Sequence, residues 1–396
     1  MVQRVYSQIC KVDATIDITI ATSSVQADSL SMQIPSQYSL VTEPERRDTA
    51  PAIMLACANL LLEQGASDDD PVVVMPIDTF ADQAYYDKIP QLAKAITASN
   101  KDLILLGVEP TYPSEKYGYI LPAESEKDGV KDVLSFREKP DEKTAKEYIS
   151  ANALWNCGVF GFKLRFLHET IEKYYVPSNY EDMLSHYGLF PKTSFDYEIV
   201  EKAKRIGVIS YSGTWKDLGT WNTLTDEMDA AVSGEASVDW NTCNNVHVIN
   251  ETSLPMVIAG LSDSVVVATQ DGILVSGKEE SAHIKELVSS AARDCPMVES
   301  SSWGRYSVLD SHQSAGQSKG EIKRIQVKQS ESIDCASLTN VYSCLVVADG
   351  TGYLETDNRE IELHPGVSFV YDHDASYKIN AISDLDLVCV EIKQTV

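Results

Sequence analysis

Charged residues cluster at the end of one strand-like run, in the segment FREKPD, Phe136–Asp141. The run VKDVLSF leads into it, and Arg137, Glu138 and Lys139 then follow one another. Pro140 ends the run, since proline has a fixed φ and no backbone N–H. Two cations thus flank an anion at the end of a strand, and the proline fixes the direction in which the chain leaves that strand. Lys139 is therefore a candidate for contact with a bound ligand.

Two aspartates follow strand-like runs and could bind one metal ion together. Asp78 ends PVVVMPID, and Asp217 lies in GVISYSGTWKDLGTW between Trp215 and Gly219. Two carboxylates from different strands can share Mg²⁺, a hard cation that takes oxygen ligands and commonly bridges to phosphates. Each aspartate alone also has a structural explanation, which for Asp78 is capping of the following helix.

Basic residues precede a predicted helix. In EPERRDTAPAI, Arg46 and Arg47 come directly before a helix start at Asp48 or Thr49. Arginines in such a place can bind a phosphate or a base edge through two parallel hydrogen bonds. The alternative is a solvated run of charges followed by an ordinary N-cap.

Three further segments have both a ligand-binding and a structural interpretation. Gly118 lies in SEKYGYIL between two tyrosines, where a glycine marks either close approach by a ligand or a β-bulge. Asn156 stands among the apolar residues of LWNCGVFGF, and a buried amide needs partners such as sugar hydroxyls. Ser194 and Asp196 open the helix of SFDYEIVEK, for which capping is the default explanation.

The composition limits the kinds of partner. The chain has 396 residues and a formal net charge of −26, which argues against broad binding to nucleic acid or to an anionic membrane surface. A small anionic substrate at a locally basic site is compatible with that charge. No apolar run approaches the roughly 20 residues of a membrane-spanning helix, and the N-terminus lacks signal-peptide features. Eight scattered cysteines without a Cys-x-x-Cys pair predict reduced thiols in a cytoplasmic protein.

Strand and helix signals predict three regions that position these residues. Residues 1–232 have the pattern of an α/β domain with a mainly parallel sheet, in which ligands bind beyond the carboxyl ends of the strands. Residues 233–300 form a β-rich connecting segment with a helix. Residues 301–396 contain regularly spaced strands that predict a small β-barrel or sandwich. Within this last region, residues 301–320 are rich in Ser, Gly and Gln and predict a loop.

Seven of these segments occur in the same order in one enzyme family. They are EPERRDTAPAI, PVVVMPID, EKYGYIL, FREKPD, LWNCGVFGF, SFDYEIVEK and WKDLGTW. From near residue 1 to about residue 300, the chain resembles the mannose-1-phosphate guanylyltransferases, most closely their bacterial long form. The resemblance implies a sugar-nucleotidyltransferase fold, which is a Rossmann-like mixed sheet with helices on both faces. It also implies the reaction of GTP with mannose-1-phosphate to give GDP-mannose and diphosphate.

The resemblance also assigns roles to the candidate residues. It implies that Asp78 and Asp217 are Mg²⁺ ligands, and that Lys139 neutralises the sugar phosphate that attacks the α-phosphorus of GTP. The other substrate-binding residues that it implies are Glu138, Asn156 and Gly118 around the mannose, Arg47 and Asp48 near the nucleotide, and Asp196. Two departures are Asp48 and Thr79, where the family usually has Asn and His.

One departure from the family concerns the start of the chain. Family members begin with a strand and a Gly-Gly-x-Gly-x-Arg-Leu loop, whose backbone N–H groups wrap the triphosphate. Here the first glycine is Gly65, and MVQRVYSQI matches the helix that follows the loop. We therefore expect a start codon assigned too late, or a fragment. We also expect the 396-residue chain, as written, to be poorly soluble and inactive.

The last part of the chain, from SSWGRYSVLD onward, resembles the cupin-like phosphomannose isomerase domain of the long, two-function enzymes. Such isomerases hold a metal with a histidine-rich cluster and a glutamate. Here Tyr377 stands where a later histidine is expected, and only His312, His364 and His373 occur, without ligand spacing. The resemblance therefore implies a metal-free barrel used for packing or dimerisation, and we expect a homodimer.

Two other functions stay open at the level of sequence. One is a non-catalytic sugar-nucleotide-binding or regulatory homologue of the same fold. The missing phosphate loop favours it, whereas the retained Asp78, Asp217 and Lys139 oppose it. The other is a nucleotidyltransferase that uses a different sugar or base.

Overall fold

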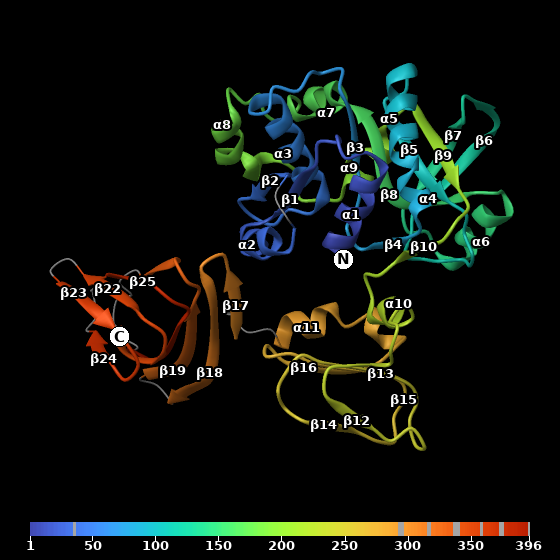
Figure 1. Ribbon diagram of the computed structural model, residues 1–396. Coiled ribbons are helices and arrows are strands. Elements are labelled where there is room, and N and C mark those ends of the chain that lie inside the picture. Colours follow the sequence, from blue (N-terminus) through green and yellow to red (C-terminus); the bar gives the residue numbers. More distant parts are fainter. Residues whose placement is uncertain are drawn as a thin grey trace. The chain divides into compact units, whose positions relative to one another are not determined.

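Two compact units make up the chain, Met1–Gly219 and Thr220–Val396. The computed structural model in Figure 1 describes residues 1–34, 37–291, 297–314, 318–335, 341–356, 359–371 and 376–394. Within these ranges, no helix is both long enough and apolar enough to cross a membrane.

A six-stranded sheet with the order β3-β8-β5-β9-β7-β6 forms the centre of the first unit. Its strands are β3 (Pro71–Val74), β5 (Leu103–Val108), β6 (Tyr119–Lys127), β7 (Val130–Arg137), β8 (Leu154–Lys163) and β9 (Ile206–Tyr211). Among these six strands, only β5 and β9 pair in parallel. The sheet is therefore mixed, as the family resemblance implied. The prediction of a mainly parallel sheet was wrong, because β6 and β7 form a hairpin and β8 runs antiparallel to its neighbours.

Helices pack on both faces of this sheet. Alternate residues of β5 point to opposite faces, so Leu103 and Leu105 join an apolar cluster with α3, while Ile104 and Leu106 join one with α1 and α5. The helices of this unit are α1 (Val2–Val12), α2 (Ser24–Gln33), α3 (Thr49–Leu62), α4 (Gln83–Tyr86), α5 (Lys88–Ala98), α6 (Glu142–Ser150), α7 (Leu164–Ile171), α8 (Tyr180–Ser185) and α9 (Phe195–Glu198). Two 3-10 turns, η1 (Tyr187–Leu189) and η2 (Val200–Lys202), lie on either side of α9 in the chain.

Two short strand pairs complete the first unit. β1 (Thr19–Ser23) pairs in parallel with β2 (Ser39–Glu43), and β4 (Thr79–Ala81) pairs antiparallel with β10 (Trp215–Asp217). The second pair joins two parts of the chain that lie far apart in the sequence. Asp78 directly precedes β4, and Asp217 is the last residue of β10.

The second unit begins with helix α10 (Trp221–Thr225) and a stack of short strands. These form a sheet of order β11-β13-β15-β16 and a pair β12-β14. Their bounds are β11 (Val232–Ser233), β12 (Ala236–Val238), β13 (Asn244–Asn250), β14 (Met256–Ile258), β15 (Ser262–Ala268) and β16 (Ile273–Gly277), followed by η3 (Glu280–Ala282) and α11 (Lys285–Ala291). Val246, Val248 and Val266 form the core between them, with Cys243 and Ile258.

Two antiparallel sheets form the rest of the second unit, as expected for a small barrel or sandwich. Their orders are β17-β18-β19-β26-β21-β24 and β20-β25-β22-β23. The strands are β17 (Val298–Ser301), β18 (Gly304–Ser314), β19 (Ser318–Val327), β20 (Ser332–Cys335), β21 (Val341–Asp349), β22 (Gly352–Thr356), β23 (Arg359–Leu363), β24 (Ser368–Tyr371), β25 (Tyr377–Ala381) and β26 (Leu385–Gln394). Residues from both sheets, including Leu345, Leu354 and Ile379, meet in one apolar core.

The predicted loop at residues 301–320 was wrong, because most of this segment belongs to strands β18 and β19. The two strands pair antiparallel, with Tyr306 opposite Ile325. Ser, Gly and Gln lower the intrinsic tendency to form a strand, but pairing with neighbouring strands decides the outcome. Of the three histidines in this region, His312 lies on β18, His364 follows β23, and His373 lies outside the described residues.

Phe195 gives a test of how the first unit holds α9. Its side chain is fully buried, and its ring centroid lies 4.8 Å from that of Phe160. Phe195→Ala leaves a cavity in this core, so we expect a loss of about 3–5 kcal/mol of stability, measured by urea unfolding followed by tryptophan fluorescence. Leu134→Ala is the matched control, because Leu134 is 67% exposed. Equal effects of the two substitutions would contradict the packing described here.

Candidate active site

The strand pair β4–β10 brings Asp78 and Asp217 together. Asp217 lies opposite Thr79 in this pair, and the Leu218 N–H donates a hydrogen bond to the Asp78 carbonyl oxygen over 2.9 Å. The Gly219 N–H donates to Asp217 Oδ1 over 2.7 Å, which holds that carboxylate in place. Two carboxylates from distant parts of the chain are therefore neighbours.

The two carboxylates repel each other. Burial raises the pKa of Asp78, and the negative charge of Asp217 raises it further. A divalent cation held between them would relieve this repulsion, and carboxylate oxygens are ligands that Mg²⁺ prefers. In the described parts of the chain, no three His, Cys, Asp or Glu side chains gather into a metal site. Asp78 and Asp217 supply carboxylate oxygens alone, and phosphate oxygens are further ligands that such an ion commonly takes.

Aromatic rings lie beside the aspartate pair. The ring centroid of Tyr117 is 5.0 Å from that of Trp155 and 5.4 Å from that of Trp215. Burial raises the pKa of Tyr117, and neighbouring negative groups, Asp217 among them, add to the shift. The indole N–H groups of Trp155 and Trp215 are buried and have no hydrogen-bond partner among the described residues. Buried donors without a protein partner are rare in native structures, so this corner is a candidate place for a ligand acceptor.

Lys139 occupies an unusual backbone position just after β7. Its φ is 44°, in the left-handed region that residues with a side chain rarely adopt. The other described non-glycine residues with positive φ are all Asn, Asp, Gln or Ser. Pro140 follows, and Asp141 caps α6 by accepting a hydrogen bond from Thr144 N over 2.7 Å. Strain of this kind is concentrated at functional positions of proteins.

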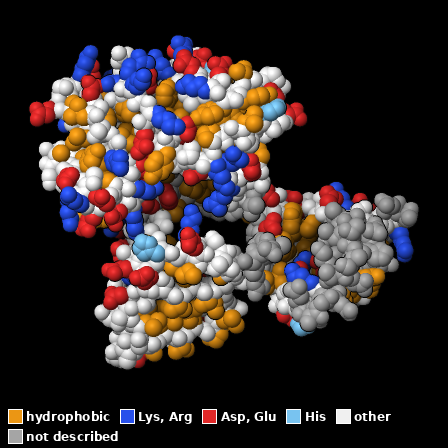
Figure 2. Space-filling model, turned by 180° about the vertical axis from the view of Figure 1, so that it is seen from behind, with side chains coloured by type: hydrophobic (Ala, Val, Ile, Leu, Met, Phe, Trp, Pro, Cys, Tyr) orange, Lys and Arg blue, Asp and Glu red, His pale blue; other side chains and the backbone are white. Residues whose placement is uncertain are grey.

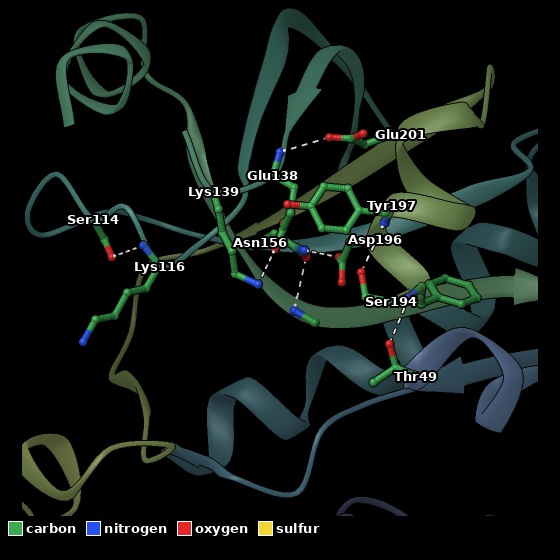
Figure 3. A network of polar contacts seen from close by, with 12 residues as sticks. Thr49, Ser114, Lys116, Glu138, Lys139, Asn156, Ser194, Asp196, Tyr197 and Glu201 are labelled. Atoms are coloured by element: carbon green, nitrogen blue, oxygen red, sulfur yellow. Dashed lines mark hydrogen bonds and ion pairs between the residues drawn. The ribbon is translucent and has the colours of Figure 1, made fainter. Parts of the chain in front are cut away.

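Glu138, Asn156 and Asp196 form a polar cluster beside Lys139 (Figure 3). Lys139 Nζ lies 3.1 Å from Glu138 Oε1, and Asn156 Nδ2 donates to Asp196 Oδ1 over 2.6 Å. Gly158 N donates to Asn156 Oδ1 over 3.2 Å. The Glu138 side chain is only 6% exposed, yet its Oε2 accepts no hydrogen bond from any described residue. The cluster therefore offers an unused buried acceptor.

Gly118 makes room for Glu138. The Asn156 N–H donates to the Gly118 carbonyl oxygen over 2.8 Å, which places this glycine against the cluster. A Cβ atom at Gly118 would collide with Glu138 Oε2 and press on Phe136. The close approach that the sequence indicated at this glycine is thus made by the Glu138 side chain.

The charges of the cluster influence one another. Burial raises the pKa of Glu138, and the negative charge of Asp196 raises it further, whereas Lys139 lowers it. Burial also raises the pKa of Asp196, against the effect of the hydrogen bond from Asn156. Partial burial lowers the pKa of Lys139, but Glu138 and the other negative groups outweigh it, so the pKa is raised. Lys139 therefore stays protonated and positively charged, beside two carboxyl groups whose ionisation is disfavoured.

Arg47 is engaged by the protein itself. Its Nε and Nη2 both donate to the Phe190 carbonyl oxygen, over 3.1 and 2.9 Å, and its Nη1 lies 2.7 Å from Glu45 Oε1. The structure thus shows Arg47 holding the loop after η1, and its place near a nucleotide stays a prediction. Asp48 has a φ of 69° and caps α3 through a 2.8 Å hydrogen bond from Thr49 N. The predicted helix start is confirmed.

Two residues of the cluster were missed by the sequence reasoning. Glu201 Oε1 accepts a hydrogen bond from Glu138 N over 3.3 Å. The Tyr197 ring is 44% exposed, and in Figure 3 it lies beside Glu138 and Asp196. Both residues belong to SFDYEIVEK, so their place in the same segment as Asp196 was the available signal.

The family model described as Nucleotidyl transferase matches residues 1–233, more than half of the chain. The chain belongs to the nucleotidyl transferase family. Its relatives include the alginate biosynthesis protein AlgA of Pseudomonas syringae pv. tomato, which is 28% identical over 352 residues and aligns with 81% of this chain and 70% of its own. A putative mannose-1-phosphate guanylyltransferase of Vibrio cholerae is 33% identical over 279 residues, 63% of this chain and 57% of its own.

Among solved structures, the mannose-1-phosphate geranyltransferase of Thermus thermophilus superposes on this chain with a TM-score of 0.56 at 25% identity. The match covers 72% of this chain and 88% of that one. A nucleotidyl transferase fold for the first unit agrees with the mixed sheet and its two layers of helices.

Lys139 and the pair Asp78 and Asp217 carry charges that could serve phosphoryl transfer. A phosphate nucleophile and a nucleoside triphosphate carry many negative charges, which Lys139 and a cation on Asp78 and Asp217 could neutralise. The carboxyl and amide groups of the cluster can bind hydroxyl groups of a second substrate.

The repulsion between Asp78 and Asp217 predicts a pH effect in metal-free buffer. The folded-state pKa of Asp78 is raised above its unfolded value of about 3.9. The folded state therefore keeps its proton to a higher pH than the unfolded state, and stability is lost as the pH rises from the unfolded pKa through the raised folded-state pKa. Asp217→Asn removes the negative charge that helps to raise the pKa of Asp78, so the folded-state pKa of Asp78 moves closer to its unfolded value. We therefore expect a higher melting temperature than in the unmodified protein at pH 7, and a smaller difference at pH 4.

The control for this experiment is Asp128→Asn, since Asp128 is exposed in the turn between β6 and β7. It should leave the melting temperature unchanged at both pH values. A lower melting temperature for Asp217→Asn at pH 7 would show that the two carboxylates do not repel each other in the folded protein.

Proposed function

We propose that the protein is a mannose-1-phosphate guanylyltransferase, which forms GDP-mannose and diphosphate from GTP and mannose-1-phosphate. One observation carries the choice of a phosphorylated sugar as substrate. Lys139 Nζ lies 3.1 Å from Glu138 Oε1, and the other oxygen of this carboxylate, Oε2, is buried and has no donor among the described residues. A phosphate next to a sugar hydroxyl presents the two complementary groups, an anion and a hydrogen-bond donor.

Each residue of the cluster has a role in this proposal. Lys139 binds the phosphate of the sugar and orients it. Glu138 accepts a hydrogen bond from a sugar hydroxyl, and Asn156 has one amide hydrogen left after donating to Asp196. Gly118 keeps the space that the Glu138 carboxylate occupies.

The transfer itself needs no covalent intermediate with the protein. An oxygen of the sugar phosphate forms a bond to the α-phosphorus of GTP, and the bond from that phosphorus to the bridging oxygen breaks. The electron pair leaves with diphosphate, so charges are redistributed but no proton must move. Positioning and charge neutralisation can carry such a step. Asp78 and Asp217 would hold Mg²⁺, which supplies positive charge to the triphosphate.

The identity of the base and of the sugar rests on the relatives. The Vibrio cholerae relative and a 28% identical Escherichia coli protein both bear the name mannose-1-phosphate guanylyltransferase. We place the enzyme in the cytoplasm, where GTP and sugar phosphates are found and where scattered cysteines stay reduced. Arg47 and Asp48 are proposed to lie near the nucleotide, with Arg47 acting through the loop that it holds.

The function is tested by measuring diphosphate release from the purified full chain. Each of the four common nucleoside triphosphates is paired with mannose-1-phosphate, and GTP is also paired with glucose-1-phosphate. Release with GTP and mannose-1-phosphate supports the proposed function and overturns the expectation, drawn from the sequence, that the 396-residue chain as written is inactive. Asp217→Asn should lower this release about 100-fold or more. A stronger reaction with another pair would identify a different nucleotidyltransferase. Binding of both substrates without release would identify a non-catalytic homologue.

Lys139 is tested by binding rather than by turnover. Lys139→Ala removes one charge-assisted contact, worth about 1.5–3 kcal/mol, so the Kd for mannose-1-phosphate should rise roughly 10- to 100-fold. The Kd for GTP should change little. Both constants are measured by isothermal titration calorimetry.

Lys116→Ala is the matched control, because Lys116 is exposed and points away from Lys139 in Figure 3. It should leave both Kd values unchanged. If Lys139→Ala binds mannose-1-phosphate as well as the unmodified protein does, Lys139 does not contact the sugar phosphate.

A further inference from the structure

The strand pair β4–β10, which brings Asp78 and Asp217 together, is short. Each strand has three residues, and the register pairs Trp215 with Ala81 at one end and Asp217 with Thr79 at the other. An isolated pair of strands is at best marginally stable in water. A shift of the pairing by one residue would also turn the Asp217 side chain to the opposite face. The closeness of the two aspartates therefore depends on contacts that hold β10 in place.

Other elements of the first unit hold β4. Ala81 is fully buried, and Arg4 Nη2 on α1 donates a hydrogen bond to its carbonyl oxygen over 3.2 Å. The guanidinium carbon of Arg4 lies 3.8 Å from the centroid of the Phe80 ring, within the range of a cation–π contact. Tyr85 and Tyr86, which follow in α4, are buried. β4 is thus the fixed partner of the pair, and β10 must be held against it.

The carboxylate of Asp82 joins the end of β4 to both ends of the turn that leads into β10. Tyr211, the last residue of β9, donates its hydroxyl hydrogen to Asp82 Oδ1 over 2.7 Å. Thr214 N, directly before β10, donates to Asp82 Oδ2 over 3.3 Å. Tyr85 N donates to Asp82 Oδ1 over 3.3 Å, so the same side chain caps α4. Both oxygens of this carboxylate therefore have partners within the protein.

The turn between β9 and β10 closes tightly over these contacts. A Cβ atom at Gly213 would collide with the Tyr211 hydroxyl oxygen and lie 2.9 Å from Asp82 Oδ2. The Tyr211 ring is buried and packs edge to face on Tyr85, with the ring centroids 5.5 Å apart. A fixed ring therefore presents the hydroxyl group to Asp82, at a turn where glycine leaves the necessary space.

Asp82 differs from an ordinary solvated aspartate. The chain has a net charge of −26, and Figure 2 shows many acidic side chains on the surface in view. Asp82 is exposed as well. The hydrogen bond from Tyr211 nevertheless lowers the pKa of Asp82, and backbone N–H groups add to this shift against the effect of partial burial. These contacts favour the charged form, in which both oxygens are acceptors.

We propose that Asp82 is a positioning residue for the pair Asp78 and Asp217. By binding the Tyr211 hydroxyl and the Thr214 N–H at once, its carboxylate holds the turn before β10 against the end of β4. The register of β4–β10 then keeps Asp217 beside Asp78. Asp82 acts through β10 and not by contact with a substrate. The inference rests on the proposed function for the use of the two aspartates, which is binding of Mg²⁺.

Two measurements on the full chain test this role without turnover. Hydrogen–deuterium exchange reports on the Leu218 N–H, whose hydrogen bond to the Asp78 carbonyl oxygen ties β10 to the residue before β4. The Kd for Mn²⁺, an ion that also suits carboxylate ligands, is measured from the electron paramagnetic resonance signal of the free ion. In Asp82→Ala we expect faster exchange of the peptide that contains Leu218 and a higher Kd for Mn²⁺. Each change should be about 10-fold, as for the loss of one hydrogen bond.

Further variants separate positioning from general stability. Tyr211→Phe removes the hydroxyl group and keeps the ring, so it should resemble Asp82→Ala. Asp82→Asn keeps an oxygen that can accept from the Tyr211 hydroxyl, so its effects should be smaller. Tyr175→Phe is the matched control, because the Tyr175 hydroxyl donates to Asp182 Oδ1 over 2.9 Å, a bond of the same kind on α8. This control should change neither the exchange of the Leu218 peptide nor the Kd for Mn²⁺.

Circular dichroism and thermal melting show whether each variant is folded, and Tyr211→Phe decides the matter if Asp82→Ala does not fold. A merely structural role predicts a lower melting temperature with an unchanged Kd for Mn²⁺, and that result overturns the proposal. The proposal is also overturned if the unmodified protein does not bind Mn²⁺, or if Asp217→Asn binds it equally well.

Diphosphate release from GTP and mannose-1-phosphate, measured in parallel, separates this inference from the proposed function. Release by the unmodified protein, together with an unchanged Kd for Mn²⁺ in Asp82→Ala, leaves the proposed function standing and shows that Asp82 does not position the pair. The expected rise of the Kd in Asp82→Ala, without release by the unmodified protein, supports the positioning role and contradicts the proposed function.

Discussion

Burial of carboxyl groups is the constraint on which the arrangement of the first unit depends. Asp78, Glu138 and Asp196 all have raised pKa values, and in each the largest cause is burial. Holding charged oxygens away from water costs free energy unless partners compensate. The surrounding apolar core must offset this cost, and bound cations and hydroxyl groups would reduce it.

The apolar core offsets the cost of burying these carboxyl groups, and it fixes the ends of the strands that carry them. β8 is buried along almost its whole length, and Asn156 on this strand is buried with it. Phe195 anchors α9 in the same core that holds Phe160, and Asp196 is its neighbour in the chain. The left-handed backbone of Lys139 is held between a strand and a capped helix. Packed strands and helices therefore support each part of the candidate site, and such support would hold the polar groups in fixed positions.

In the barrel of the second unit, half-buried charged groups are paired with one another. Lys323 Nζ lies 2.6 Å from Glu391 Oε2 and 3.3 Å from Glu321 Oε2, so these half-buried groups compensate one another within the protein. The first unit leaves a buried carboxylate oxygen without a donor among the described residues, whereas this cluster pairs its charges. Such self-contained pairing suits a structural role.

The sequence by itself determined the local elements and the family. Apolar runs and punctuating residues placed β3, β5 and the start of α3, because these depend on side-chain pattern, capping and proline geometry close by in the chain. The ordered segments from EPERRDTAPAI to WKDLGTW indicated a nucleotidyltransferase with a mixed sheet, and the family match over residues 1–233 agrees.

Only the tertiary structure decided the pairings between distant segments. The antiparallel partners of β8 and the strands β18 and β19 were not visible locally, since a ladder depends on neighbours far away in the chain. The engagement of Arg47 by Phe190, the fit of Glu138 against Gly118, and the participation of Tyr197 and Glu201 were decided in the same way. Contacts of this kind depend on how packed elements approach each other, which no single segment encodes.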